Sequence, residues 1–427
     1  MQRVLSLDQS PPLRTVLRFF LGTPLFLLLA GALLAWQGEA ALQSRWAPAT
    51  LALTHLFTLG ALGMSMAGAL IQILPVVAGV VLPRARVMAP AVHALLGTGT
   101  LALAAGFLMA EAWLFQAALA LLVPALSWLC GCVIVALWQP QAEGAAPMLA
   151  TVRLALGALV ITVALGALLA SSFGRPGAPS PLPMALATDL HAMWGVLGWA
   201  GLLVTGVAFQ VVPMFQVTPL YPVAVHQRLG VAVFLLLVAS SISAPIALTL
   251  LMLAYACFAG VTLSLLARRK RPEPDAMTLF WCMSMLSLAG CFALWLVPGT
   301  GAGRTLALGV LALVGFLYSA INGMLYKIVP FLVWHHLQER AAPGQRAPGV
   351  KHIIPDARAQ RQFWMQAAAL ALLLAACWFP AALARPAGVA LAASALWLAW
   401  NLVSALRIAA LTRPASSGNR DTTARSV

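Results

Sequence analysis

Three stretches of the chain share one pattern: Gly68–Pro75 (GALIQILP), Gly206–Pro213 (GVAFQVVP) and Gly323–Pro330 (GMLYKIVP). They begin 138 and 117 residues apart, and each interval holds four apolar segments. Self-similarity at a long spacing predicts an internally repeated fold. We therefore expect an all-helical, polytopic membrane protein whose 12 transmembrane helices form three pseudo-symmetric sets of four. The repeat units would cover about 16–138, 148–267 and 277–411.

Composition places the chain in a bilayer, because 62% of its 427 residues are hydrophobic and only 8% are charged. About twenty apolar residues span the hydrocarbon. Stretches of about this length occur at 16–36, 48–74, 88–109, 112–138, 148–172, 186–212, 228–244, 246–267, 277–297, 305–331, 362–383 and 386–411. The first is long and precedes eleven others, so we read it as a helix and not as a signal peptide. Residues 1–413 would form one transmembrane domain, and 414–427 a disordered cytoplasmic tail.

The distribution of positive charge predicts the orientation. With the N-terminus inside, all but four of the 25 Lys and Arg residues fall in cytoplasmic tails, loops or adjoining helix ends, the exceptions being Arg45, Arg175, Arg304 and Arg385. This asymmetry follows the positive-inside rule for a protein with both termini in the cytoplasm. We expect a multi-pass protein of the bacterial cytoplasmic (inner) membrane. Its net charge of +15 suits contact with anionic lipid headgroups, and without a soluble basic domain no nucleic acid is expected as a partner.

Each repeat places a glycine and a polar residue on one helix face, one turn before a proline. Small residues let neighbouring helices approach closely. The polar residues Gln72, Gln210 and Lys327 could satisfy the carbonyl that the proline frees. Alternatively they line an inner polar cavity together with His93 and His226, which occur in the matching contexts AVHALLG and AVHQRLG. An intramembrane lysine is costly and is a functional candidate, although Lys327 could also snorkel to the interface.

Two other histidines, His55 and His191, lie within about the first two turns of the second and sixth predicted spans, at the outer face. Pro75 follows His55 by 20 residues, about 30 Å along a helix, so the repeated pattern belongs to the inner half. Imidazole suits haem iron and copper. The shared depth makes both residues candidate cofactor ligands, with His191 the candidate metal ligand. Their registers differ, because His191 precedes Pro213 by 22 residues, and two extra residues turn a side chain by about 200°. Simple packing of each ring is the alternative.

Other polar and sulfur-containing residues give weaker signals. All six cysteines lie in apolar segments and none forms Cys-x-x-Cys-His, which excludes a covalently attached haem of the usual kind. Adjacent His335 and His336 point to different sides of a helix, so a shared metal there is not expected. Met64 and Met66 could supply soft copper ligands but more often serve packing.

Carboxylates are scarce, and Glu111 and Asp189 are the acids that we place nearest to a span, close to predicted outer helix ends. No carboxylate lies at mid-membrane, although coupled transporters usually place ionisable groups there. This absence disfavours secondary transport and proton pumping.

The pattern resembles subunit I of the haem-copper oxidases, including the nitric-oxide reductase branch, and secondarily the NnrS-type haem and copper membrane proteins. His55-x4-Gly60-x2-Gly63-x4-Gly68-x6-Pro75 is similar to the family's second helix, where a histidine near the outer face ligates haem. His191-x3-Gly195 followed by Pro213 is similar to the sixth helix, which carries a copper-ligating histidine. Gly323–Pro330 resembles the end of the tenth. The resemblance implies twelve helices in three arcs of four.

The chain also departs from that family. Leu308-Gly309-Val310 stands where the tenth helix has its His-x-His, and Val238-Ala239-Ser240-Ser241 stands where the seventh has paired copper histidines. Neither redox centre can be built as in the oxidases, so an active terminal oxidase or nitric-oxide reductase is not expected.

Three functions remain open from the sequence, and no catalytic residue is assigned. In the first, His55 and His191 hold one haem or copper ion near the periplasmic face, for electron transfer, nitric-oxide or metal response, or cofactor handling. In the second, the scaffold serves as a permease or channel with the inner polar cavity. In the third, the chain is a structural subunit of a membrane complex. Lipid is a partner in each, with an electron-transfer protein or complex subunits as further partners.

Overall fold

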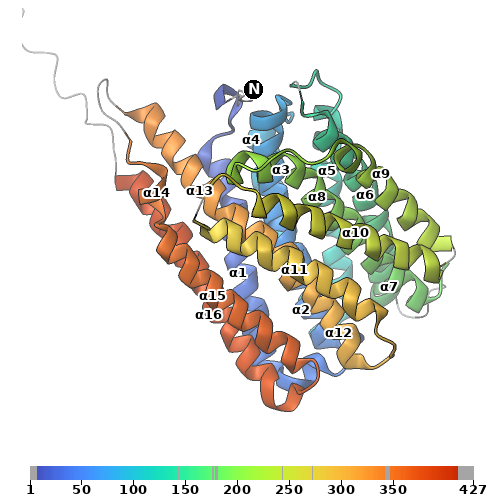
Figure 1. Cartoon of the computed structure of the whole chain (residues 1–427). Helices are drawn as coiled ribbons and strands as arrows, with labels where there is room; N and C mark the ends of the chain where they lie inside the picture. Colours follow the sequence, from blue (N-terminus) through green and yellow to red (C-terminus); the bar gives the residue numbers. More distant parts are fainter. Residues whose placement is uncertain are drawn as a thin grey trace, which may run out of the picture.

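The computed structural model describes residues 7–142, 144–175, 177, 181–242, 244–271, 273–341 and 347–411. These residues form helices, with no strand among them (Figure 1). The predicted tail at 414–427 lies outside the described residues. Eleven helices in the described part are long and apolar enough to cross a membrane. The chain is therefore a multi-pass membrane protein, as the composition predicts.

Most spans are single helices. They are α1 (Leu13–Gln37), α4 (Ala85–Met109), α5 (Ala112–Ala136), α6 (Ala146–Gly174), α9 (Val223–Ile242), α10 (Ala244–Ala267), α11 (Ala276–Leu296) and α16 (Pro380–Leu411). Short helices η1 (Leu7–Gln9), η2 (Gly38–Leu42) and α14 (Val350–Ile353) flank them. The predicted span at 362–383 corresponds to α15 (Asp356–Ala376), which is not among the eleven, and its first turns carry Asp356, Arg358 and Arg361.

Three spans each contain a π-helical segment between two α-helical segments. They run through α2 (Pro48–His55), η3 (Leu56–Gly63) and α3 (Met64–Ala78); through α7 (Met184–Met193), η4 (Trp194–Gly201) and α8 (Leu202–Gln216); and through α12 (Ala302–Val310), η5 (Leu311–Tyr318) and α13 (Ser319–Arg340). We call these the central spans. Each holds one of the repeated stretches, with Pro75, Pro213 and Pro330 inside continuous helix.

The segments η3, η4 and η5 are π-helical and eight residues long. Each begins twelve residues before the repeated glycine: Leu56 before Gly68, Trp194 before Gly206, and Leu311 before Gly323. π-Helices are rare, and they occur frequently at functional sites. The segment η5 contacts both η3 and η4. The sequence pattern did not predict this feature.

The helices pack in a recurring order. α1 contacts α3 and α4, and α4 contacts α5; α6 contacts α8 and α9, and α9 contacts α10; α11 contacts α13 and α15, and α15 contacts α16. Further contacts join α5 to α6 and α10 to α11. The last helix, α16, packs along α1, so the described helices at the two ends of the bundle lie side by side (Figure 1).

Each repeated glycine lies directly against a helix of the surrounding bundle. A Cβ atom on any of the three would come 2.9 Å from the Cβ of a facing residue: Phe19 of α1 for Gly68, Thr151 of α6 for Gly206, and Phe280 of α11 for Gly323. That distance is shorter than van der Waals contact, so only glycine permits the approach. The repeated glycines therefore set how closely the central spans pack.

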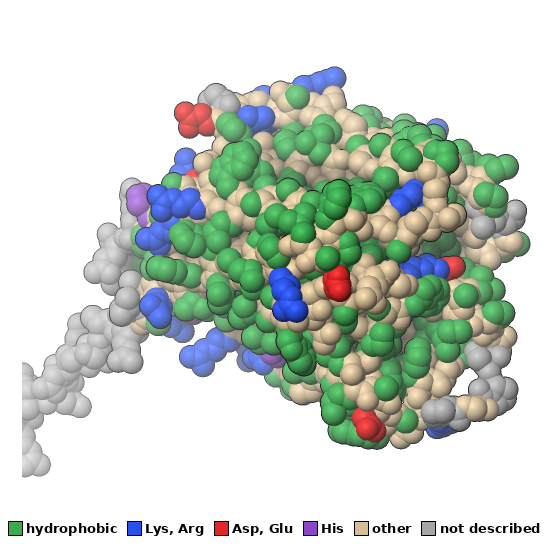
Figure 2. All heavy atoms as spheres, turned by 90° about the horizontal axis from the view of Figure 1, so that it is seen from below, with side chains coloured by type: hydrophobic (Ala, Val, Ile, Leu, Met, Phe, Trp, Pro, Cys, Tyr) green, Lys and Arg blue, Asp and Glu red, His purple; other side chains and the backbone are tan. Residues whose placement is uncertain are grey.

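The outer surface suits lipid. Figure 2 shows hydrophobic side chains over most of one face, with Lys and Arg gathered mainly toward one edge, at the left of the view. Large apolar side chains such as Leu235 of α9, Ile246 of α10 and Trp400 of α16 are exposed. Large apolar side chains exposed over many helices are favourable where they meet hydrocarbon, which is the surrounding of a membrane-spanning bundle.

We predict that Gly206→Leu lowers the thermal unfolding temperature of the detergent-solubilised protein, because overpacking a tight helix contact costs about 1–3 kcal/mol. Gly260→Leu in α10 is the matched control, since a Cβ there meets nothing within 4 Å. Equal unfolding temperatures for the two variants would show that the glycine contact does not hold the helices together.

Candidate functional site

A cavity of about 1390 Å³ lies among the three central spans and helices α4, α5 and α6. It is larger than an ordinary small-molecule pocket of about 300–1,000 Å³. Its walls are mostly Leu, Val, Ala and Phe side chains, with few polar groups. Both predicted ligands, His55 and His191, line it.

His55 is the last residue of α2, immediately before the π segment η3. Its Nδ1 lies 2.8 Å from the carbonyl oxygen of Leu51, one turn earlier. A carbonyl can only accept, so in this pair Nδ1 carries the hydrogen. Nε2 of the neutral ring is then left with a free lone pair, which is the form that binds a metal. Phe107 of α4 stacks on the ring, with centroids 5.3 Å apart.

His191 lies on α7 and is held in the same way by a different helix. Its Nδ1 is 3.0 Å from the carbonyl oxygen of Thr162 in α6, so here too Nε2 keeps its lone pair. Gly166 of α6 makes room for the ring, because a Cβ there would lie 2.9 Å from Cε1 of His191. Metal-binding histidines usually have a hydrogen bond at the ring nitrogen that does not bind the metal, and this bond fixes the tautomer and the orientation of the ring.

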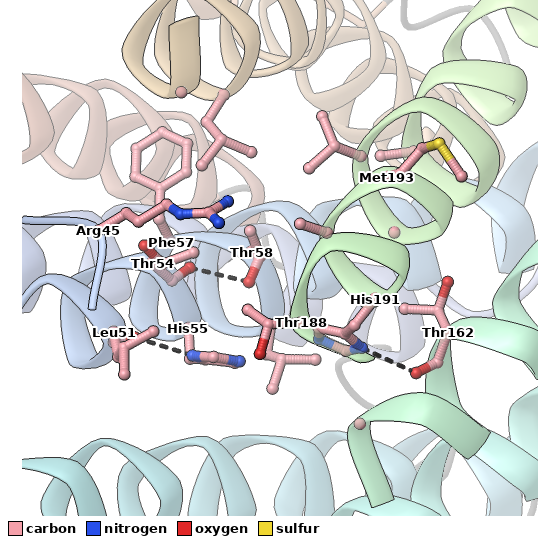
Figure 3. Close-up of a pocket in the computed structure, with 18 of the residues that line it drawn as sticks. Arg45, Leu51, Thr54, His55, Phe57, Thr58, Thr162, Thr188, His191 and Met193 are labelled. Carbon is pink, nitrogen blue, oxygen red and sulfur yellow. Dashed lines mark hydrogen bonds between the residues drawn. The ribbon is translucent and has the colours of Figure 1, made fainter. Parts of the chain in front are cut away.

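The two rings lie opposite each other across the cavity. Their centroids are 6.2 Å apart and their planes differ by 21°. In Figure 3 the hydrogen-bonded nitrogens lie on the far sides of the pair, and the other nitrogens point toward one another. Two metal–nitrogen bonds of about 2.0–2.1 Å need nitrogens that are roughly 4 Å apart or less. The two Nε2 atoms point toward one another and could hold one metal centre between them, and the cavity leaves room for a larger group around it.

An ion pair ties together the segments that carry the histidines. Arg45, three residues before α2, places Nη1 2.6 Å from Oδ1 of Asp189, two residues before His191. The Arg45 guanidinium also lies over the ring of Trp46, 4.4 Å from its centroid. All three residues border the cavity or its rim. The sequence reading noted Asp189 only as an acid near a helix end and did not pair it with Arg45.

The predicted inner polar residues do not line this cavity. Gln72 donates from Nε2 to Ser10 Oγ at 3.2 Å, and Gln210 is buried in α8. His93 packs edge-on against Phe19, with centroids 5.3 Å apart. His226 places Nδ1 3.2 Å from the carbonyl oxygen of Tyr221.

Lys327 forms an ion pair, an arrangement that neither sequence reading foresaw. Its Nζ lies 2.6 Å from Oδ2 of Asp275, which caps the start of α11 by accepting from the backbone nitrogen of Thr278 at 2.9 Å. Gln216 at the end of α8 donates to the same carboxylate at 3.2 Å. Asp275 directly precedes α11, as Glu111 precedes α5, and Asp189 lies within α7, so Asp275 joins the two acids that the sequence placed nearest to a span. An aspartate immediately before an apolar run is an N-cap signal that could have found it.

The remaining candidates divide between packing and the cavity. Met64 packs against Gly22 and Gly97, whereas Met66 borders the cavity, as does Met193 of α7. Among the described residues no group of three or more His, Cys, Asp or Glu side chains could hold a metal ion. His55 and His191 thus form a pair without a third side chain of these kinds grouped with them in the described part of the chain.

No protein-family model matches the chain, and no curated protein matches it. The functional assignment therefore rests on the geometry of the site.

Acid should weaken the contact at Asp275. Burial raises the pKa of this carboxyl, but the hydrogen bond and charge of Lys327 outweigh burial, so its pKa lies below the usual 3.8. A lowered pKa stabilises the fold fully above the unfolded value, and the contribution disappears as pH falls through the folded value. We expect Asp275→Asn to lower the unfolding temperature at neutral pH, and the gap to wild type to close progressively as the pH falls below the usual carboxyl pKa of 3.8.

Glu273→Gln is the control for that experiment, because it removes a neighbouring carboxylate whose side chain is exposed. It should leave the unfolding temperature unchanged across the same range. A gap between wild type and Asp275→Asn that stays constant down to the lowest pH would rule out a role for the ionised carboxylate.

Proposed function

We propose that this chain is a membrane haem protein in which His55 and His191 would hold one haem, and that it serves electron transfer. The observation that carries the proposal is the facing pair of imidazoles, each with Nδ1 bound to a carbonyl and Nε2 turned into the cavity. The cavity volume of about 1390 Å³ favours a large planar group as the ligand, in preference to a metal ion alone. Apolar walls suit the body of such a group.

The protein's own residues have separate tasks in this proposal. The carbonyls of Leu51 and Thr162 orient the rings, and Gly166 keeps the space that His191 occupies. The Arg45–Asp189 pair holds the two histidine-bearing segments together at the rim. Haem would supply a one-electron couple whose potential depends on its axial ligands and on burial. Because both imidazoles would bind the same iron, the site would suit electron transfer rather than the binding of oxygen or nitric oxide.

We further propose the architecture of haem-copper oxidase subunit I, with twelve spans in three sets of four and α15 as the twelfth. Three observations support it. The π segments share one register relative to the repeated glycines. Each repeated glycine packs on the first helix of its set. The contacts within and between sets recur three times and close on α1.

The proposed orientation has both termini in the cytoplasm of a bacterial cell, in the cytoplasmic membrane. It rests on the asymmetry of the Lys and Arg residues between the two faces. Under this orientation, Pro48 and Met184 begin their helices at the periplasmic side. His55 and His191 then lie within reach of a periplasmic electron-transfer partner.

A second candidate is a copper ion in place of haem. Two facing imidazole nitrogens can hold one copper ion, and thioether sulfur is a soft ligand that favours Cu(I). Met66 and Met193 both border the cavity, and Figure 3 shows Met193 on the helix that carries His191. We do not propose the permease, because Lys327 is paired with Asp275 and none of the five inner polar residues lines the cavity.

We expect the purified protein to show a Soret band with the low-spin spectrum of bis-histidine haem, and His55→Ala or His191→Ala to lose that spectrum. His93→Ala is the matched control and should keep it, because His93 packs against Phe19 outside the cavity. Metal analysis of the same samples separates the candidates. Stoichiometric copper without a Soret band would show that copper, and not haem, is the bound cofactor. The absence of both would contradict the proposed site.

Gly166→Val tests the positioning of His191 without removing a ligand. The added side chain would overlap the ring, so we expect haem to be retained through His55 but to shift from low-spin to high-spin absorption. Gly157→Val on the same helix is the control, because the nearest atom to its Cβ is 3.7 Å away. An unchanged spectrum in Gly166→Val would mean that His191 is not an axial ligand.

A further inference from the structure

The region between η5, α13, α15 and α16 encloses polar side chains that the histidine site does not use. Seven of them are buried, with at most 7% of their surface exposed: Tyr318, Asn322, Tyr326, Gln362, Gln366, Ser394 and Asn401. We call this set the polar stripe. It lies in the part of the chain whose central span has no histidine in the place of His55 or His191.

The stripe runs along the helices. Tyr318, Asn322 and Tyr326 follow one another at steps of four residues, and so share one helix face. Gln362 and Gln366 do the same on α15. Eight residues of helix cover about 12 Å, so the polar groups extend over a large part of the bundle's interior.

Hydrogen bonds link most of the stripe. Asn322 Nδ2 donates to Tyr318 Oη at 3.2 Å and to Gln362 Oε1 at 3.0 Å. Gln362 Nε2 donates to Ser394 Oγ at 3.0 Å, and that hydroxyl donates to Gln366 Oε1 at 3.1 Å. A separate pair joins Asn401 Nδ2 to Tyr326 Oη at 3.0 Å.

Three buried polar atoms at the stripe have no hydrogen-bond partner among the described residues: Asn322 Oδ1, Gln366 Nε2 and Trp281 Nε1 of α11. Each belongs to a side chain at most 1% exposed. Trp281 lies beside the same stretch of α13, because its Cδ1 is 3.5 Å from the Cβ position of Gly323, the residue that follows Asn322 in the sequence. One acceptor and two donors left unpaired in one region is the pattern that a buried water molecule satisfies.

The stripe also connects two described regions. At one end the ring of Tyr318 packs edge-on against Phe57, with centroids 5.8 Å apart, and Phe57 lines the histidine cavity. At the other end Asn401 Nδ2 approaches the carbonyl oxygen of Arg358 at 3.5 Å, near the start of α15. There Asp356 accepts from the backbone nitrogen of Ala276, beside the Asp275–Lys327 pair.

We propose that the polar stripe binds a short chain of water molecules, which bridges Asn322, Gln366 and Trp281 and extends between the start of α15 and the wall of the cavity at Phe57. Water supplies both the donor and the acceptors that these atoms need. The proposal does not depend on which cofactor, if any, His55 and His191 bind.

Radiolytic hydroxyl labelling with mass spectrometry tests this, because radicals formed from bound water oxidise the side chains beside it. In the wild-type protein in detergent, Trp281 and Tyr318 should be oxidised several-fold faster than Tyr255. Tyr255 is equally buried, at 1% exposed, and its hydroxyl donates to the carbonyl of Leu197. Labelling of Trp281 and Tyr318 at the rate of Tyr255 would overturn the proposal.

Two variants locate the water. Asn322→Leu and Gln366→Leu each remove one of the unpaired atoms, and should reduce labelling of Trp281 and Tyr318 to the level of Tyr255. Thr262→Val in α10 is the control, since its buried hydroxyl is already paired with Tyr221 and Phe258, and it should change neither. The rate at which the Trp281 indole hydrogen exchanges in D₂O is a second readout on wild type alone, and exchange as slow as that of a dry buried indole contradicts the water chain.

Discussion

A bilayer core offers no water to polar groups, so each polar side chain inside this bundle needs a partner from the protein. The rest of the structure depends on how that need is met. His55 and His191 donate to main-chain carbonyls, and Lys327 pairs with a capping aspartate. The amide and hydroxyl groups of the polar stripe bind one another. The atoms left over mark the places where a ligand or water can enter.

The histidine pair shows how offset positions can converge. The two residues differ by two positions relative to their prolines, which turns one side chain by about 200° relative to the other. If the two histidines held equivalent positions on their spans, both side chains would point in the same rotational direction around the bundle. Only one of them would then point toward the other span. Because the spans border the cavity from opposite sides, the offset brings the rings together at 6.2 Å. The two-residue difference in the sequence therefore accompanies the approach of the two rings in one cavity.

The three central spans have similar backbones but different polar contents. All have a π segment in the same register and a glycine packed on a neighbouring helix. The first two contribute histidines to the cavity, whereas the third borders it with Leu308 and Val310 and turns Tyr318, Asn322 and Tyr326 toward α15 and α16. Gln72 and Lys327 occupy matching places but bind a serine and an aspartate respectively. The scaffold is thus constant, and the chemistry differs with the side chains that each span presents.

The sequence by itself determined what depends on local composition and period: an all-helical membrane protein, most of its spans, the glycines at close contacts, and His55 and His191 as candidates at one depth. These follow from apolar length and residue type along a single helix. The tertiary structure alone decided what depends on direction and on distant neighbours. The facing of the two rings, the Thr162 carbonyl, the space at Gly166, and the pairing of Lys327 with Asp275 all join residues from separate helices. Rotation of each helix about its axis is set by packing, and one sequence without that packing does not contain it.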